Sequence, residues 1–353
     1  MKKHIAVIFG GMSTEHEVSC VSAAGVVDNM DKDKFEISKI GITKEGVWFL
    51  YTGSTESMRT QKWSQETENL YPAIISPCTV HHGFMVLDKP NKKYEIVRVD
   101  AAFPVLHGKN GEDGTIQGLL RIAGIPFVGS DTYASAVCMD KSATKILCEK
   151  ENIPIVPFIC ARNTPDFDLE KLRTEAEQRF GYPMFIKPAN AGSSVGVTKA
   201  YDRASFEKGV KTAFENDRKI LIEKAVKGKE IEVAVLGNDN PVASVCGEID
   251  PHSEFYDYET KYINDTAEYF IPARIDSALN KKISETAVKA YKALDCRGLA
   301  RVDFFACEDG SFYLNEINTI PGFTPISMYP SLMENAGYAY PALIEKLIEL
   351  ALA

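Results

Sequence analysis

Four polar side chains near the C-terminus have the types and the spacing of a cation or phosphate site. They lie in the stretch from Gly298 to Gly322, where two runs of β-forming residues flank Asp309-Gly310. Asp-Gly between such runs predicts a β-hairpin. A turn centred on this dipeptide would place two opposed pairs on one face, which are Asp303 with Glu316 and Arg301 with Asn318.

These side chains could bind a metal ion, because two facing carboxylates repel unless a cation lies between them. The oxygen atoms of Asp303, Glu316 and Asn318 suit Mg²⁺, which usually keeps waters and shares its shell with phosphate groups. The alternative is an edge hairpin whose polar face contacts solvent, and the hairpin alone leaves both interpretations open. In the turn that follows, 319–324, the N–H of Gly322 can point at an anion.

The composition is that of an ordinary globular protein. The chain has 353 residues, enough for two or three domains that each bury a core, and 45% of the residues are apolar and 25% charged. A net charge of -9 argues against a nucleic-acid or anionic-membrane surface, because both need clustered Lys and Arg.

Cysteine usage and hydropathy indicate a cytoplasmic protein. The eight cysteines are dispersed and form neither a CxxC pair nor the Cys/His spacing of a zinc site, so reduced structural thiols are expected. No stretch approaches the roughly 18 apolar residues of a membrane span. We also expect no targeting segment.

The N-terminus predicts the start of an α/β unit. Residues 4–9 are an apolar run typical of a buried strand, and a glycine pair leads from it into a helix. Thr14 and Glu17 fit a capping box, which would place Glu15 in the first helical turn. The helix dipole favours an acid there, so Glu15 by itself indicates no site.

A glycine-rich loop closes this first unit. The polar segment 51–91 has little periodicity and is interpreted as an elaboration of the first domain. His107 follows a strand end, where ligands of α/β sheets collect, but a histidine bonded within its own loop explains it equally well. A boundary is expected near residue 130, before one helix over 135–151 in which Lys141 could simply be solvated.

The stretch around Lys187 could bind phosphate. A strand over 183–187 ends on this lysine, and a turn of small residues, 192–196, leads into the next strand. Backbone N–H groups of such a turn, with a lysine beside them, can hold phosphates. The spacing is not that of a P-loop, and a mobile hairpin remains an alternative.

Two further segments could complete a ligand site. Glu223 and Lys224 end a predicted strand and Glu230 begins the next, an arrangement that offers backbone groups to a purine edge. The loop 248–265 is rich in tyrosine and charged residues and has little apolar material to bury. A loop that long is usually disordered or a functional lid, and its tyrosines favour a lid.

These pieces, in this order, resemble the D-alanine:D-alanine ligases of the ATP-grasp superfamily over essentially all of residues 1–353. The motifs that carry the resemblance are GGMSTEHEVS, HGKNGEDGTIQG, MDK, IKPANAGSSVGV, EFYDYETKY, RVDFF and NEINTIPGFTPISMYP. The family implies an α/β fold with an N-terminal parallel domain and two sheet-containing domains that clasp ATP. The expected bounds are 1–129, 130–223 and 224–353, with a lid at 248–265 and a metal-binding hairpin at 299–318.

The resemblance also implies an activity. ATP would phosphorylate one D-alanine, and the amine of a second would attack the acyl phosphate to give D-alanyl-D-alanine for peptidoglycan synthesis. Two Mg²⁺ or Mn²⁺ would be held by Asp303, Glu316 and Asn318. The expected ATP contacts are Lys141, Lys187, Ser194, Glu223, Lys224, Glu230 and Lys261. The expected catalytic groups are Glu15, Ser193, Tyr262, Arg301 and Gly322, and the other substrate contacts are His107, Ser327 and Met328.

Two alternatives stay open. The N-terminal half is also similar to the D-Ala:D-Ser ligases of vancomycin resistance, although SMYP at 327–330 resembles the dipeptide ligases more. An apolar Met328 would offer nothing to bond a serine hydroxyl. The alternative of another class is a nucleotide-binding regulatory protein without catalysis. The family further implies a homodimer, with neither nucleic acid nor membrane as a partner.

Overall fold

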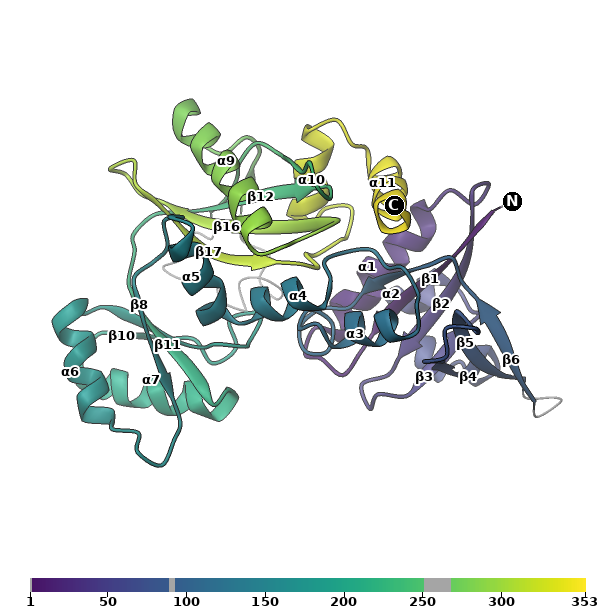
Figure 1. Cartoon of the computed structure of the whole chain (residues 1–353), viewed down its shortest axis with the longest axis horizontal. Helices are drawn as coiled ribbons and strands as arrows, with labels where there is room; N and C mark the ends of the chain where they lie inside the picture. The colour runs from purple at the N-terminus through teal and green to yellow at the C-terminus, as the bar shows by residue number, and fades with distance from the viewer. Residues whose placement is uncertain (1, 89–92, 251–267) are drawn as a thin grey trace.

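The chain folds around three β-sheets. The computed structural model describes residues 2–88, 93–250 and 268–353. In Figure 1 a seven-stranded sheet lies on the right, a four-stranded sheet at the lower left and a six-stranded sheet at the upper left. Helices pack on each of them, which confirms the expected α/β class.

The seven-stranded sheet contains the N-terminal part of the chain, in the order β6-β5-β4-β3-β2-β1-β7. Its strands are β1 (Lys3–Gly10), β2 (Phe35–Ile42), β3 (Trp48–Tyr51), β4 (Leu70–Ile75), β5 (Gly83–Asp88), β6 (Lys93–Arg98) and β7 (Ala101–Val105). β1 pairs in parallel with β2 and β7, whereas β2 to β6 pair antiparallel. The expected parallel sheet is therefore limited to three strands, and segment 51–91 supplies strands that periodicity did not reveal.

The helices of this unit are α1 (His16–Asn29), α2 (Thr55–Arg59) and α3 (Thr115–Ile122), with 3₁₀ turns at Trp63–Gln65 and Thr67–Asn69. β1 ends in a tight turn at Gly10, whose φ is 86° and whose added Cβ would lie 2.2 Å from the Ile42 carbonyl oxygen. The predicted capping box is wrong, because α1 begins only at His16. Glu15 takes the N-cap position without capping the helix, which leaves its carboxylate for other contacts.

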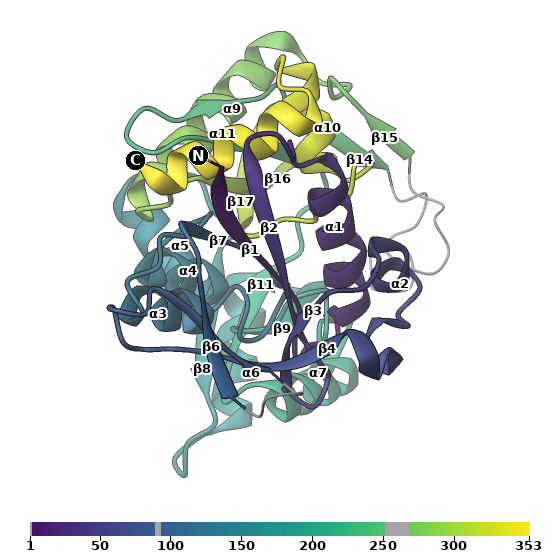
Figure 2. The same ribbon diagram turned by 90° about the vertical axis from the view of Figure 1, so that its right-hand side faces the viewer.

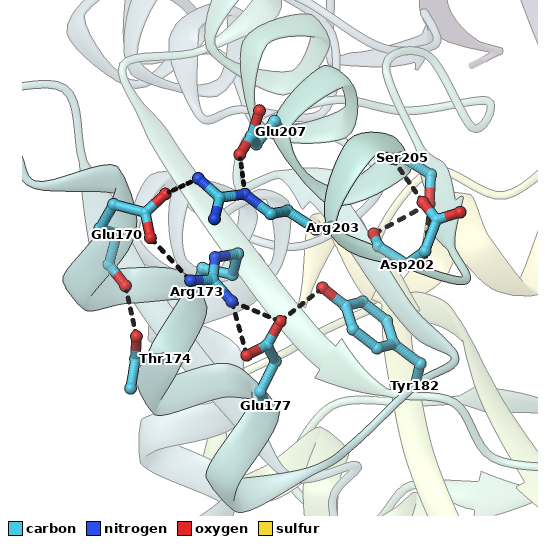
Figure 3. Close-up of polar contacts among 9 residues, drawn as sticks. All are labelled: Glu170, Arg173, Thr174, Glu177, Tyr182, Asp202, Arg203, Ser205 and Glu207. Atoms are coloured by element: carbon cyan, nitrogen blue, oxygen red, sulfur yellow. Dashed lines mark hydrogen bonds and ion pairs between the residues drawn. The ribbon is translucent and has the colours of Figure 1, made fainter.

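The four-stranded sheet has the order β10-β9-β11-β8 and is antiparallel. Its elements are β8 (Phe158–Arg162), α6 (Leu169–Arg179), β9 (Met184–Pro188), β10 (Thr198–Ala200), α7 (Arg203–Asn216) and β11 (Lys219–Lys224). An ion-pair network joins α6 and α7 (Figure 3): Arg173 is bonded to Glu170 and Glu177 within α6, and Arg203 of α7 is bonded to Glu170.

The six-stranded sheet carries the predicted hairpin. Its elements are β12 (Lys229–Leu236), β13 (Val242–Ala243), β14 (Gly247–Asp250), β15 (Glu268–Phe270), α9 (Ser277–Ala293), β16 (Leu299–Ala306), β17 (Phe312–Asn318), α10 (Met328–Asn335) and α11 (Tyr340–Leu352). β17 lies at the edge of the sheet, beside β16. None of the helices in the described residues is long and apolar enough to cross a bilayer.

Two helical segments pack outside the unit in which their sequence position would place them. Leu343 and Ile344 of α11 share a core with Ile5 and Val7 of β1, and Figure 2 shows α11 lying across β1 and α1. α4 (Thr132–Met139) and α5 (Lys141–Lys150) share a core with the six-stranded sheet. The division at residues 129 and 223 stays a prediction.

The single helix predicted over 135–151 is in fact these two helices. The break lies at Asp140, whose backbone is extended and whose side chain accepts hydrogen bonds from the N–H groups of Ser142 and Ala143. Asp140 thus caps α5, because a short carboxylate satisfies the first N–H groups of a helix. Lys141 becomes the first residue of α5, and its side chain points to the site instead of to solvent.

Candidate active site

Asp303 faces Glu316, and Arg301 faces Asn318, as the hairpin interpretation predicts. The register has a different origin, however. Near the turn Ala306 pairs with Phe312, one residue away from the register that a two-residue turn would set. A β-bulge then inserts one extra residue, Asn315, into β17 and restores the predicted pairing further along. The two departures cancel at the site.

The bulge has a chemical consequence, since Asn315 and Glu316 both line the same cavity although they are neighbours in sequence. Lys187 Nζ donates a hydrogen bond to Asn315 Oδ1 at 3.4 Å. Lys141 Nζ lies 3.2 Å from Glu316 Oε2. Lys141 of α5 and Lys187 of β9 therefore both contact the bulged strand. Asn315 was not identified from the sequence, because strict alternation in a strand would point its side chain away from the site.

Protein cations already balance the acids of the hairpin. Arg301 donates two hydrogen bonds of 2.8 Å to Asp303 and lies 3.1 Å from Glu232. Burial alone would lower the pKa of Arg301, but Asp303 and Glu232 raise it well above its usual range. Asp303 is only 8% exposed. The interpretation as a solvated polar face is therefore wrong.

The hairpin also offers ligands that fit a divalent cation. Within residues 2–88, 93–250 and 268–353, no group of three or more His, Cys, Asp or Glu residues could by itself hold a metal ion. Asp303, Glu316 and the Asn318 amide are hard oxygen donors at one face, and phosphate oxygens would have to supply the remaining ligands. Such a donor set suits Mg²⁺ that arrives with a nucleotide.

A first cavity, of about 90 Å³, lies above this face. It is lined by the predicted residues Glu15, His107, Lys141, Ser193, Arg301, Glu316, Asn318 and Gly322. Ser193 Oγ donates a hydrogen bond of 2.7 Å to Glu15 Oε1, which joins the loop before α1 to the loop after β9. Ser193 reaches this position with a left-handed backbone, φ 49°.

His107 and Glu112 also line this cavity. His107 Nδ1 lies 3.0 Å from the carbonyl oxygen of Ile320, and its buried Nε2 has no hydrogen-bond partner. Burial lowers the pKa of His107, so the ring is neutral, donates from Nδ1 and keeps Nε2 as an acceptor. This tautomer follows from the hydrogen bond of Nδ1 to Ile320, because a carbonyl oxygen can only accept.

Glu112 was not identified from the sequence. Its Oε2 accepts a hydrogen bond of 2.7 Å from Gly108 N, and burial together with the nearby Glu15 raises its pKa to about 8. Gly108 fits closely between the two acids, because an added Cβ would lie 2.8 Å from Glu15 Oε2. The feature of the sequence that could have identified Glu112 is the turn HGKNGE, 107–112, which brings Glu112 back to Gly108.

A second cavity, of about 170 Å³, adjoins the first. The two cavities share Lys141, Ala191, Ser193 and Glu316. The second is lined by the predicted nucleotide residues Lys187, Ser194, Glu223, Lys224 and Glu230, at the ends of β9, β11 and β12. Lys187 Nζ lies 2.7 Å from Glu223 Oε2.

Three predicted residues that the structure describes, Asp303, Ser327 and Met328, line neither cavity. Ser327 Oγ is bonded to Thr324 at 2.8 Å, and Ser327 does not line the first cavity. Met328 is buried in the core, where a Cβ on Gly247 would lie 2.8 Å from its sulfur. Lys261 and Tyr262, with most of the expected lid, lie outside the described residues.

Comparisons with known proteins agree with this geometry. Family models described as D-ala D-ala ligase N-terminus and C-terminus match residues 4–130 and 147–349. The D-alanine--D-alanine ligase of Acetivibrio thermocellus is 48% identical over 99% of this chain and 96% of its own length. The solved VanG D-Ala:D-Ser ligase from Enterococcus faecalis is 42% identical, with a TM-score of 0.91 over 99% of this chain and 100% of its own. The D-alanine-D-alanine ligase from Coxiella burnetii is 35% identical, with a TM-score of 0.85 over 99% of this chain and 94% of its own.

Proposed function

The chain belongs to the D-ala D-ala ligase family, and we propose that it joins two D-alanine molecules at the expense of ATP, for peptidoglycan synthesis. The observation that carries this proposal is the pair of adjoining cavities. The first cavity contains Glu15 and His107, which could hold an amino acid, and Arg301, which could stabilise an oxyanion. The second contains Lys187, which could bind phosphates. Lys141 and Glu316, which line both, stand where phosphate would pass from one ligand to the other.

In the first step a carboxylate oxygen of one D-alanine bonds to the γ-phosphorus while the bond to ADP breaks. Lys141 and Lys187 attract the phosphates, and the small-residue turn that carries Ser194 covers them. Asp303, Glu316 and Asn318 would hold the divalent cations, which neutralise phosphate charge when bound. The backbone of Glu223, with Lys224 and Glu230, would contact the adenine and the ribose.

In the second step the amine of another D-alanine attacks the carbonyl carbon, and phosphate leaves. Glu15, fixed by Ser193, would hold the ammonium of the first D-alanine. Arg301 and the N–H of Gly322 would stabilise the oxyanion, a contribution of about 3–4 kcal/mol for each donor. Lys261 and Tyr262 would close over the site and exclude water, which would otherwise hydrolyse the acyl phosphate.

A D-Ala:D-Ser ligase is the second candidate, because the VanG D-Ala:D-Ser ligase has a very similar structure. The sequence relatives named D-alanine--D-alanine ligase are more similar, at 48% identity. Met328 does not distinguish the two candidates, since its side chain is buried in the core. Substrates other than D-alanine must therefore be compared directly.

The test is ADP release from ATP with D-alanine, with and without Mg²⁺, followed by identification of the product. We expect release that requires both D-alanine and a divalent cation, and a product that remains D-alanyl-D-alanine when D-serine is present in tenfold excess. D-alanyl-D-serine as the main product would support the second candidate. No turnover with either amino acid over a range of pH would leave a non-catalytic nucleotide-binding protein. We further propose that the protein is cytoplasmic and forms a homodimer. Light scattering of the purified protein would check the dimer.

A further inference from the structure

A fully buried lysine lies directly behind the second cavity. Lys145 is on α5, one turn after Lys141, and is 0% exposed. Its Nζ lies 3.0 Å from Glu223 Oε1 and donates to the carbonyl oxygen of Val156 at 3.5 Å. Lys145 is absent from the lining of the cavity, so it reaches a ligand only through Glu223.

Lys145, Glu223 and Lys187 form a continuous row of charges, in which Lys145 and Glu223 are buried and Lys187 is half-buried. Glu223, on β11, is 2% exposed, and its two oxygens contact the two ammonium groups, at 3.0 Å and 2.7 Å. The three groups together carry one net positive charge. Lys187 is the member that faces the cavity and also contacts Asn315 of the bulged strand. The net positive charge of these three groups therefore lies at Lys187, where a ligand in the cavity can contact it.

Burial of these charged groups costs free energy, which indicates that they have a role other than stabilising the fold. Removing an ammonium and a carboxylate from water is repaid only by close pairing, and apolar residues of similar size often replace such groups without loss of stability. Burial lowers the pKa of Lys145. Burial would raise the pKa of Glu223, but Lys145 and Lys187 lower it below its usual value. Glu223 therefore stays ionised in the core.

We propose that Lys145 is a positioning residue for nucleotide binding: it neutralises Glu223 from behind and leaves the charge of Lys187 to the phosphates. Without Lys145, Glu223 and Lys187 would form a neutral pair, and the charge of Lys187 would be balanced inside the protein. The inference rests on the proposed function, because it takes the ligand of the second cavity to be a nucleotide.

The experiment is calorimetric titration of Mg²⁺-ADP into the full chain and its variants. Lys145→Met should weaken ADP binding by roughly 10- to 30-fold, which is the effect of one charge about 8 Å away at an effective dielectric constant of about 20. Lys145→Gln keeps a donor for Glu223 but loses the charge, and it should weaken binding similarly. Lys150→Met is the matched control, since it removes an exposed lysine from the same helix and should leave the affinity unchanged.

A double variant separates a charge effect from a packing effect. Lys145→Met with Glu223→Gln restores one net positive charge at Lys187, so it should bind ADP more tightly than Lys145→Met alone. A merely structural lysine would not produce this rescue. Unchanged ADP affinity in folded Lys145→Met and Lys145→Gln, or no rescue in the double variant, would overturn the proposal. Failure of the unmodified protein to bind ADP would instead contradict the proposed function.

Discussion

Two charge networks in the middle of the chain have similar ion-pair distances and opposite surroundings. On α6 and α7, Arg173 lies 2.6 Å from Glu170 and 2.7 Å from Glu177, and Arg203 extends the network (Figure 3). Behind the second cavity, Glu223 lies 3.0 Å from Lys145 and 2.7 Å from Lys187. The side chain of Glu170 is 53% exposed, whereas that of Glu223 is 3% exposed.

The difference lies in what replaces a lost partner. At the surface, water solvates an unpaired charge, so most exposed ion pairs contribute little to stability. In the core no water is available, and removal of one partner leaves an uncompensated charge. Ion-pair distance alone would therefore predict equal contributions to stability from the two networks, whereas their burial predicts different ones. The following changes test this separation.

The largest effect on stability is expected from Glu223→Met. This change leaves the fully buried Lys145 without its carboxylate, so the free energy of unfolding should fall by about 3–5 kcal/mol. Urea denaturation measures it. The double variant Lys145→Met with Glu223→Met removes both charges and should recover most of the loss. A decrease below about 1 kcal/mol in Glu223→Met would show that the buried network tolerates an unpaired charge.

An intermediate effect is expected from pH, through Glu112. Its pKa is raised to about 8, so between pH 4.5 and pH 8 the folded protein retains a proton that the unfolded chain has released. Stability attributable to Glu112 is therefore complete below pH 4.5 and is lost as the pH rises towards 8. Glu112→Gln should reduce the loss between pH 5 and pH 8 by roughly 1–3 kcal/mol.

The measurement is the urea midpoint of the unmodified protein and of Glu112→Gln at pH 5 and at pH 8. The exposed network should show the opposite sign. Hydrogen bonds from Arg173 lower the pKa values of Glu170 and Glu177, so their contribution is present above pH 4.5 and is lost on acidification. Equal pH dependence of Glu112→Gln and the unmodified protein would contradict the assignment of a raised pKa.

The smallest effect is expected from Arg173→Met. This change breaks the ion pairs to Glu170 and Glu177 but leaves both acids in contact with water. We expect the melting temperature to fall by no more than about 2 °C, and by less in 1 M NaCl, with no change in ADP affinity. A melting temperature lowered as much as in Glu223→Met would refute the comparison.

Much of the site could be predicted from local patterns. The alternation of β16 and β17 predicted Asp303 opposite Glu316, and the resemblance to the ligase family implied that Glu15 and Ser193 belong to one site. Residue parity puts Asp303 and Arg301 on one face of β16, but the pairing with Glu316 also needed the bulge at Asn315, which cancels the offset near the turn. The capping box at Thr14 failed because the two glycines and the turn after β1 delay the helix to His16.

Other features depend on contacts between distant segments. No local pattern identifies the partner of Lys145, since Glu223 is 78 residues away along the chain and reaches it only when α5 packs behind β11. Met328 was expected to contact a substrate, but packing against Gly247 places it in the core. α11 likewise follows the hairpin in sequence and packs with β1.

Residue types and their spacing were thus sufficient for the family and for the facing pair Asp303 and Glu316, although a bulge that was not predicted sets their register. They also identified Lys141 and Lys187, which line one cavity. The packing of the three sheets was needed to bury Lys145, to raise the pKa of Glu112 and to turn Asn315 towards Lys187. The physical reason is that local geometry follows from a few neighbouring residues, whereas burial and charge compensation depend on which distant segments exclude water. Lys145 would be an ordinary solvated lysine on an isolated helix, and its function follows from the sheet that covers it.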